Sequence, residues 1–268
     1  MRILFPLLFI FGLISCKKES SLEISSEKDT AVLQKNNTTD TASLATFPFE
    51  TELCANKGYY DSSKYTKDQL EGTFEVYYKL SGITINSPGV FDLAALEDVR
   101  KNKEKILQKL DQDYEITRQK LNNLQVVDSK YWNDAKKTLL KEHDARFEFE
   151  KTKIEAFSDP SVLVNSRFSK DCNHYALALN TDETTMIAEW KKLRETMSKV
   201  NADPENILRE FNERLNSKEK RNYAMVDLIT FGWGNCVNQN IPHLEHDENM
   251  TQEFNSLFVK IDRDCDEP

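Results

Sequence analysis

The eight residues from Phe231 to Asn238 include the side chains of this sequence best suited to holding a ligand. They read Phe-Gly-Trp-Gly-Asn-Cys-Val-Asn, so a glycine stands on each side of Trp233. The glycines would leave the indole open as a stacking platform, and Asn235 and Asn238 would supply amide donors and acceptors for a sugar or a peptide. The alternative is structural: the first glycine ends a helix, Trp233 fills the core and Cys236 fastens the loop.

A second group of polar residues follows Pro242. Two histidines and three carboxylates fall within the six residues from His243 to Glu248, and both residue types bind zinc and other divalent ions. A spacing of three residues in a loop matches no recognised closed site, and a third ligand would have to come from elsewhere. We therefore interpret His243 and His246 as part of an acidic surface loop, with a metal site as the alternative.

Two further histidines are interpreted as structural. His174 stands two residues after Cys172 and could serve as the base for a thiol, but residues two apart on a helix point away from each other. His143 lies among apolar positions of a predicted helix and is expected to be packed. The sequence contains no Gly-x-Ser-x-Gly, phosphate-binding glycine loop or His-Glu-x-x-His motif. No catalytic residue emerges, so we favour a protein that is not an enzyme and has no cofactor.

The elements that would position these groups are helices. Apolar residues recur at intervals of three and four from Asp92 onward, and again after a turn at residues 127–129 as far as Pro160. This spacing predicts two long antiparallel helices with a coiled-coil seam, each about 40 Å long at 1.5 Å per residue. Shorter helices are expected to begin after capping signals at Thr66 and Asp203.

The end of the chain also has helical spacing. A helix is expected from about Glu219 to Thr230, stopping at the Trp233 segment, and a last one is expected over Phe254–Ile261. Glycine and proline are scarce, at 7 each in 268 residues, and no convincing alternating strand occurs. The prediction is an all-α, disulfide-braced domain over residues 47–268, built around the long antiparallel helix hairpin.

The first residues carry an export signal. Met1-Arg2 precedes an apolar run to Ile14 that is too short to remain as a membrane helix. The run ends in Leu13-Ile14-Ser15-Cys16, which resembles the lipobox of bacterial lipoproteins. The resemblance implies that residues 1–15 are a type II signal peptide and that Cys16 carries acyl chains such as palmitate. We expect a lipid-anchored protein of the cell envelope, in the outer membrane of a Gram-negative bacterium, with the periplasmic and surface faces as open alternatives.

Four of the five cysteines remain once Cys16 is lipidated: Cys54, Cys172, Cys236 and Cys265. An even number in an oxidising compartment indicates two disulfides. Three pairings are possible and the sequence does not choose between them, although we favour Cys54–Cys265 with Cys172–Cys236. A free catalytic or metal-binding thiol is the alternative.

A polar segment separates Cys16 from the domain. Residues 17–46 are rich in Ser, Thr, Lys, Glu and Asn and contain no aromatic residue, which predicts a disordered tether over residues 16–46. Asp29-Thr30-Ala31 and Asp40-Thr41-Ala42 resemble the Asp-Ser/Thr-apolar sequon that some Gram-negative bacteria O-glycosylate. The resemblance implies that Thr30 and Thr41 are O-glycosylated. The alternative is a plain solvated linker without this modification.

Charge restricts the partners. The formal net charge of −9 becomes −10 when the single arginine of residues 1–15 is removed. An acidic chain repels the phosphates of nucleic acid and anionic lipid headgroups, so we expect neither as a partner. We expect a non-enzymatic binding lipoprotein with an inhibitory or protective role, whose partner is a protein or a glycan of the envelope. The alternative is a glycan or peptide hydrolase with its site near Trp233 to His246, which requires an accessible indole and converging histidines.

Overall fold

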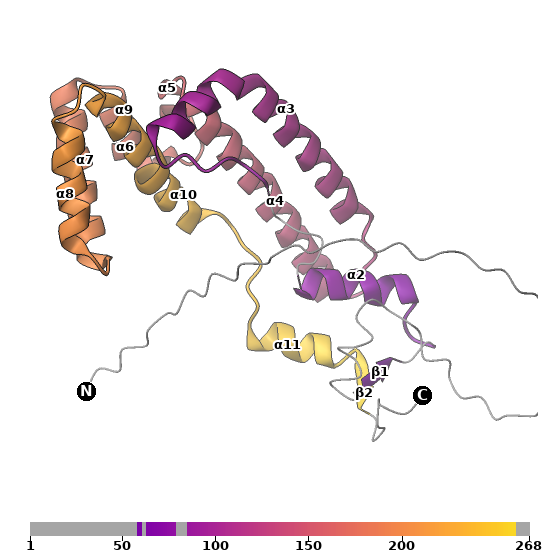
Figure 1. Cartoon of the computed structure of the whole chain (residues 1–268). Coiled ribbons are helices and arrows are strands. Elements are labelled where there is room, and N and C mark those ends of the chain that lie inside the picture. Colours follow the sequence, from indigo (N-terminus) through magenta and orange to yellow (C-terminus); the bar gives the residue numbers. More distant parts are fainter. Residues whose placement is uncertain (1–57, 61–62, 79–84, 261–268) are drawn as a thin grey trace, which may run out of the picture. The chain divides into compact units, whose positions relative to one another are not determined.

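The computed structural model describes residues 58–60, 63–78 and 85–260, and these residues are almost entirely helical (Figure 1). The helices are α2 (Lys67–Tyr78), α3 (Leu93–Asn123), α4 (Lys130–Ala156), α5 (Ser161–Val164), α6 (Ser169–Leu179), α7 (Glu183–Val200), α8 (Pro204–Leu215), α9 (Lys220–Asp227), the π-helix η1 (Leu228–Trp233), α10 (Gly234–Asn240) and α11 (Glu248–Asn255). Two strands, β1 (Gly58–Tyr60) and β2 (Phe258–Lys260), pair antiparallel. Within the part of the chain that the structure describes, no helix is long and apolar enough to cross a membrane.

Several predicted features lie outside the described residues. These are the signal peptide, the tether, the start of the domain near residue 47, and the residues Cys16, Thr30, Thr41, Cys54, Cys265 and Ile261. The all-α fold class itself is confirmed.

Side-chain caps account for where the helices begin. The Oγ1 of Thr66 accepts from the Gln69 amide at 3.2 Å, and the Gln69 side chain accepts from the Thr66 amide at 3.0 Å. Asp92 accepts from Ala95 N at 2.8 Å and begins α3. Each cap satisfies amide donors that have no partner within the helix. The predicted starts at Thr66 and Asp92 are therefore confirmed, as is the start of α8 after Asp203.

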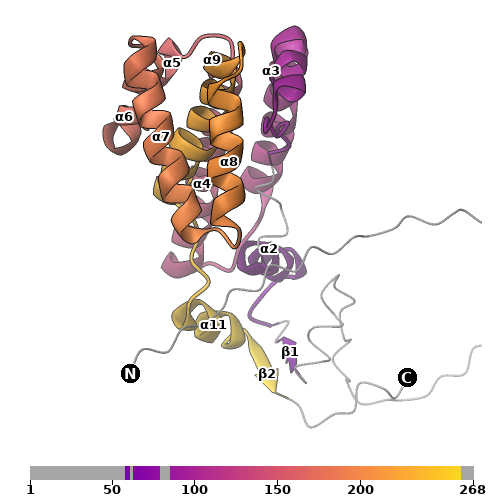
Figure 2. The ribbon, with the colours of Figure 1, turned by 60° about the vertical axis from the view of Figure 1, so that its left-hand side comes forward.

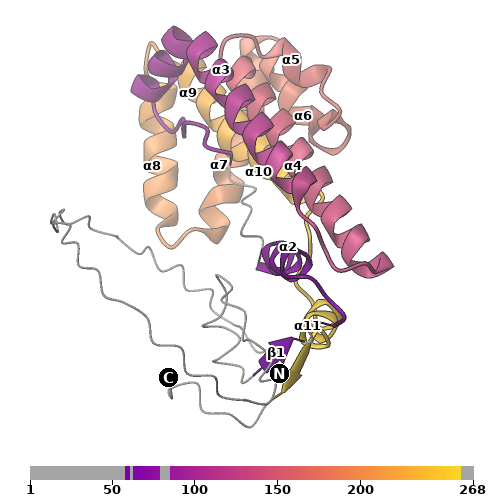
Figure 3. The same ribbon diagram turned by 90° about the vertical axis from the view of Figure 1, so that its right-hand side faces the viewer.

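Helices α3 and α4 lie side by side (Figure 3). Their contacts pair the later residues of one helix with the earlier residues of the other: Asp111 with Lys151, Tyr114 with Asp144, and the Asn122 carbonyl with Lys136. The two helices are therefore antiparallel.

Helix α4 contributes to both hydrophobic clusters of the described residues. Trp132 and Leu139 pack in a cluster with α2 and α11, whereas Phe149 and Ile154 pack in a larger cluster with α6, α7 and η1. All four side chains are at most 6% exposed. A change in the position of α4 would therefore disturb the packing of both clusters.

Helices α7, α8 and α9 lie close together (Figure 2). A buried carboxylate joins them. Asp227 is fully buried and accepts from Trp190 Nε1 at 2.5 Å and from Arg194 Nε at 2.7 Å. Arg214 approaches its other oxygen at 3.3 Å, and Glu210 lies within 3.6 Å of both arginines. Buried charges are tolerated only when they are paired and hydrogen-bonded in this way.

The end of the chain departs from the sequence prediction in two places. The helix expected to stop at Phe231 continues through η1 into α10. Gly232 lies inside it and allows close packing, since a Cβ there would lie 2.7 Å from the Tyr175 ring. The prediction for the end of the last helix was also wrong, since Phe258 lies in β2 opposite Tyr60. Local periodicity does not reveal a strand of three residues whose partner is distant in the sequence.

We expect Asp227→Ala to lower the free energy of unfolding by about 3–5 kcal/mol, because the buried Arg194 would lose its closest partner and keep only Glu210 at 3.6 Å. Urea denaturation measures the change. The control is Glu213→Ala, which removes an exposed ion pair with Arg209 and should cost less than about 1 kcal/mol. Equal losses in the two variants would contradict a stabilising role for the buried network.

Candidate functional site

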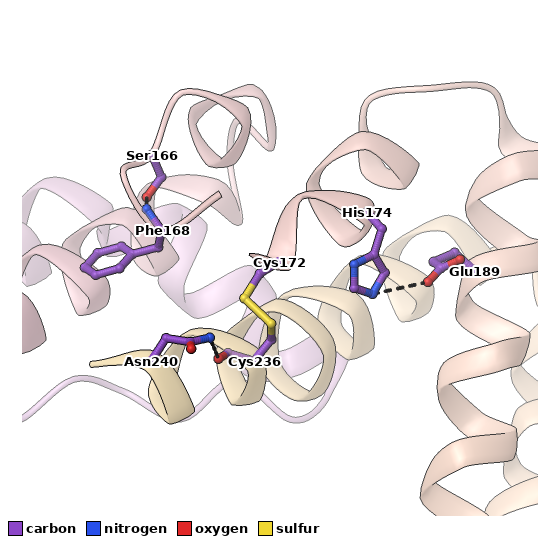
Figure 4. Close-up of a disulfide and its surroundings, with 7 residues drawn as sticks. All are labelled: Ser166, Phe168, Cys172, His174, Glu189, Cys236 and Asn240. Atoms are coloured by element: carbon purple, nitrogen blue, oxygen red, sulfur yellow. Dashed lines mark hydrogen bonds and ion pairs between the residues drawn. A yellow bond between two sulfur atoms is a disulfide. The ribbon is translucent and has the colours of Figure 1, made fainter. Parts of the chain in front are cut away.

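The disulfide of the described residues joins Cys172 on α6 to Cys236 on α10 (Figure 4). This is one of the two pairings favoured from the sequence. Because its sulfur is in the disulfide, Cys172 offers no thiol nucleophile. His174 is half exposed, and its Nε2 lies 3.6 Å from Glu189 Oε1 on α7. This histidine is therefore directed to a carboxylate and does not act as a base for a cysteine thiol.

Trp233 does not form the open stacking platform considered from the sequence. Its side chain is fully buried and its ring stacks on Phe149 with 5.5 Å between centroids. Asn235 and Asn238 are exposed on α10, and Asn238 Oδ1 accepts from Arg146 Nη1 at 3.3 Å. The structural alternative for Trp233 is the one observed, since its indole fills the core. Its glycine neighbours serve close packing as well: a Cβ on Gly232 would lie 2.7 Å from the Tyr175 ring, and one on Gly234 would lie 2.9 Å from the Ile229 carbonyl oxygen.

The two C-terminal histidines are directed to different partners. His243 is exposed, with Nε2 3.9 Å from Glu245 Oε1, whereas the His246 ring packs on Tyr77 at 4.2 Å between centroids. Within the described ranges, no three His, Cys, Asp or Glu side chains are grouped so that they could hold a metal ion. His143 is buried on α4, with Nε2 3.1 Å from the Tyr114 carbonyl oxygen, as expected for a packed residue.

A surface pocket of about 520 Å³ lies on α4, at a place that the sequence did not indicate. It is lined by Lys130, Tyr131, Asp134, Ala135, Thr138 and Leu244. The first five share one face of the helix, and Leu244 reaches them from the segment between α10 and α11. The volume is within the range of ligand-binding pockets, and its lining combines apolar groups with a few polar ones.

The wall formed by Leu244 is fastened to α4 by a buried carboxylate. Glu142 is 2% exposed, and its Oε2 accepts from the Leu244 amide at 2.7 Å. Its Oε1 accepts from Arg146 Nε at 3.1 Å, and Arg146 also donates to Asn238 on α10. Since Cys236 joins α10 to α6 as well, the helix that precedes this wall is attached to two other helices.

Exposed carboxylates follow the pocket residue Leu244 in the sequence. We use the name acidic rim for Glu245, Asp247, Glu248 and Glu253, which are all exposed. Asp247 Oδ1 also accepts from Met250 N at 2.7 Å and thereby caps α11. Burial raises the pKa of Tyr131, and the charges of Asp247 and Glu253 raise it further. Two rim carboxylates therefore lie near enough to the pocket to act on the Tyr131 phenol.

The candidate site is thus the α4 pocket together with the acidic rim, and not the residues that the sequence motifs emphasised. Its geometry has the features of a binding surface: apolar lining, exposed charge and a wall held by buried hydrogen bonds. No family model matches the chain, and neither a curated protein nor a solved structure does.

We expect the double variant Asp247→Asn/Glu253→Gln to lower the pKa of Tyr131, because the two negative charges disfavour the phenolate. Burial should still hold that pKa above its usual value. Ultraviolet difference titration measures it, with Tyr131→Phe to identify the signal. Asparagine preserves the α11 cap, and Glu97→Gln on α3 is the control. A Tyr131 pKa that is unchanged by the double variant would show that the carboxylates do not act on the pocket.

Proposed function

We propose that this chain is a lipid-anchored binding protein of the bacterial cell envelope, and that its binding site is the α4 pocket. The pocket is the observation that carries the proposal, since an open, largely apolar hollow on a helical face suits insertion of a partner's side chain. The partner is a protein of the envelope, and binding to it would inhibit or protect that protein.

The scaffold supports this proposal. The five α4 residues that line the pocket belong to a helix packed in both hydrophobic clusters, and Leu244 is bonded to the same helix through Glu142. A surface that is already ordered loses little conformational entropy when a partner docks. By contrast, burial of Trp233 and the separate contacts of His243 and His246 give no support to a hydrolase site there.

The anchor rests on the lipobox resemblance at Leu13–Cys16. Several acyl chains on Cys16 would hold the protein to the outer membrane, since each buried methylene contributes about 0.8 kcal/mol. Residues 16–46, as a flexible coil, would place the domain on the order of 30 Å from the membrane. Glycosylation of Thr30 and Thr41 within this tether remains part of the proposal.

Cys16→Ser in the full chain should abolish lipid attachment, because serine lacks the sulfur that accepts the diacylglycerol. Metabolic labelling with palmitate and membrane fractionation measure the loss. Ser15→Ala keeps a small residue before the cysteine and should leave labelling intact. Palmitate incorporation by the Cys16→Ser chain at the wild-type level would rule out this anchor.

Thr138→Trp should reduce capture of the envelope partner at least tenfold, because the indole would fill the pocket. The full-length chain is purified in detergent, immobilised and exposed to an envelope extract, and the bound proteins are quantified. Thr196→Trp is the matched control, since Thr196 is exposed on α7. If the Thr138→Trp chain keeps its fold by circular dichroism and captures as much partner as the control, the α4 pocket is not the binding site.

A further inference from the structure

Positive charge is missing from a long stretch of the chain that includes the acidic rim. No Lys or Arg occurs between Arg221 and Lys260, whereas roughly five would be expected in a stretch of that length from the 36 Lys and Arg among 268 residues. Asp227, one of the carboxylates of this stretch, is neutralised by the buried Arg194 and the partly buried Arg214. The other four form the acidic rim.

The rim carboxylates are available to a partner. Within the described part of the chain, Asp247, Glu248 and Glu253 form no ion pair with a Lys or Arg, and the partner of Glu245 is His243 at 3.9 Å. Exposed carboxylates without counter-charges produce a negative potential that attracts cations. A basic group that approaches α11 would therefore meet uncompensated charge.

The pocket beside the rim has its own carboxylate. Asp134 lines it and pairs with Lys137 at 3.1 Å, and both of these side chains are more than half exposed. An exposed pair of this kind contributes little stability, so a partner's cation can replace the lysine. Among the described residues that line the pocket, Lys130 is the one cation, and its charge opposes such binding.

The remaining lining fits the rest of a basic side chain. Ala135 and Leu244 offer apolar surface to the methylene stem of a lysine or arginine. The ring of Tyr131 can attract the cation through its π-face. The pocket therefore has apolar surface for the stem of such a side chain and the carboxylate of Asp134 for its charged end.

We infer that the α4 pocket receives a lysine or arginine side chain from a basic segment of the partner protein, while the acidic rim binds neighbouring cations of the same segment. This inference rests on the proposed binding function and names the chemistry of its partner. Opposite charge on the two surfaces accelerates association and makes binding weaken as salt rises.

The test uses the full-length chain in detergent and two probes, hexalysine and hexaglutamate with blocked termini, in calorimetric titrations at low and physiological salt. The test variant is Asp247→Asn/Glu248→Gln/Glu253→Gln. The matched control, Glu97→Gln/Glu115→Gln/Glu205→Gln, removes the same amount of charge from exposed positions on α3 and α8.

Hexalysine should bind the wild type, and the rim variant should weaken this binding at least tenfold, against less than about twofold for the control. Thr138→Trp should also weaken it, and Lys130→Ala should strengthen it. Equal losses in the rim and control variants would overturn the inference, because binding would then reflect net charge alone. Preference for hexaglutamate, lost in Lys130→Ala, would overturn it in favour of an anionic ligand.

The two proposals fail in different ways. If envelope capture depends on Thr138 but neither salt nor the rim variant alters it, the binding function stands and the basic partner is wrong. If Thr138→Trp leaves capture unchanged, the pocket is not the site and the proposed function fails with it.

Discussion

The hydrogen bond from the Leu244 amide to the buried carboxylate of Glu142 is the interaction on which the site depends. A carboxyl group at 2% exposure is costly unless its oxygens are hydrogen-bonded, and here the Leu244 amide and Arg146 Nε satisfy one oxygen each. Glu142 lies between the α4 residues of the two clusters. The same bond that offsets this cost therefore fixes one wall of the pocket relative to the other.

Several attachments around this bond hold the walls of the pocket together. Arg146 extends from Glu142 to Asn238 on α10, and the disulfide from Cys236 holds α10 to α6. The segment that carries Leu244 and the acidic rim thus follows a helix that is held from two sides. Rigidity on one side of an interface reduces the entropy lost on binding, which supports the proposed binding function.

The features predicted from the sequence were those that depend on neighbours a few residues away. Caps at Thr66 and Asp92 need only the first turn of a helix, and the long helices follow from local periodicity. The pocket combines a helix face with Leu244, which is distant in the sequence, so no local signal reveals it. Trp233 shows the same limit, since flanking glycines fit an open indole or a tightly packed one, and only the contact with Phe149 decides between them.

Hydrogen–deuterium exchange of the full-length chain, with and without hexalysine, tests most directly whether a basic ligand binds where the geometry places it. We expect slower exchange of backbone amides in residues 130–138 and 244–253, with the amides of α7 and α8 unchanged. Protection spread evenly over the exposed carboxylates of the chain, or confined to other helices, would contradict the assignment of the α4 pocket and its acidic rim as the binding site.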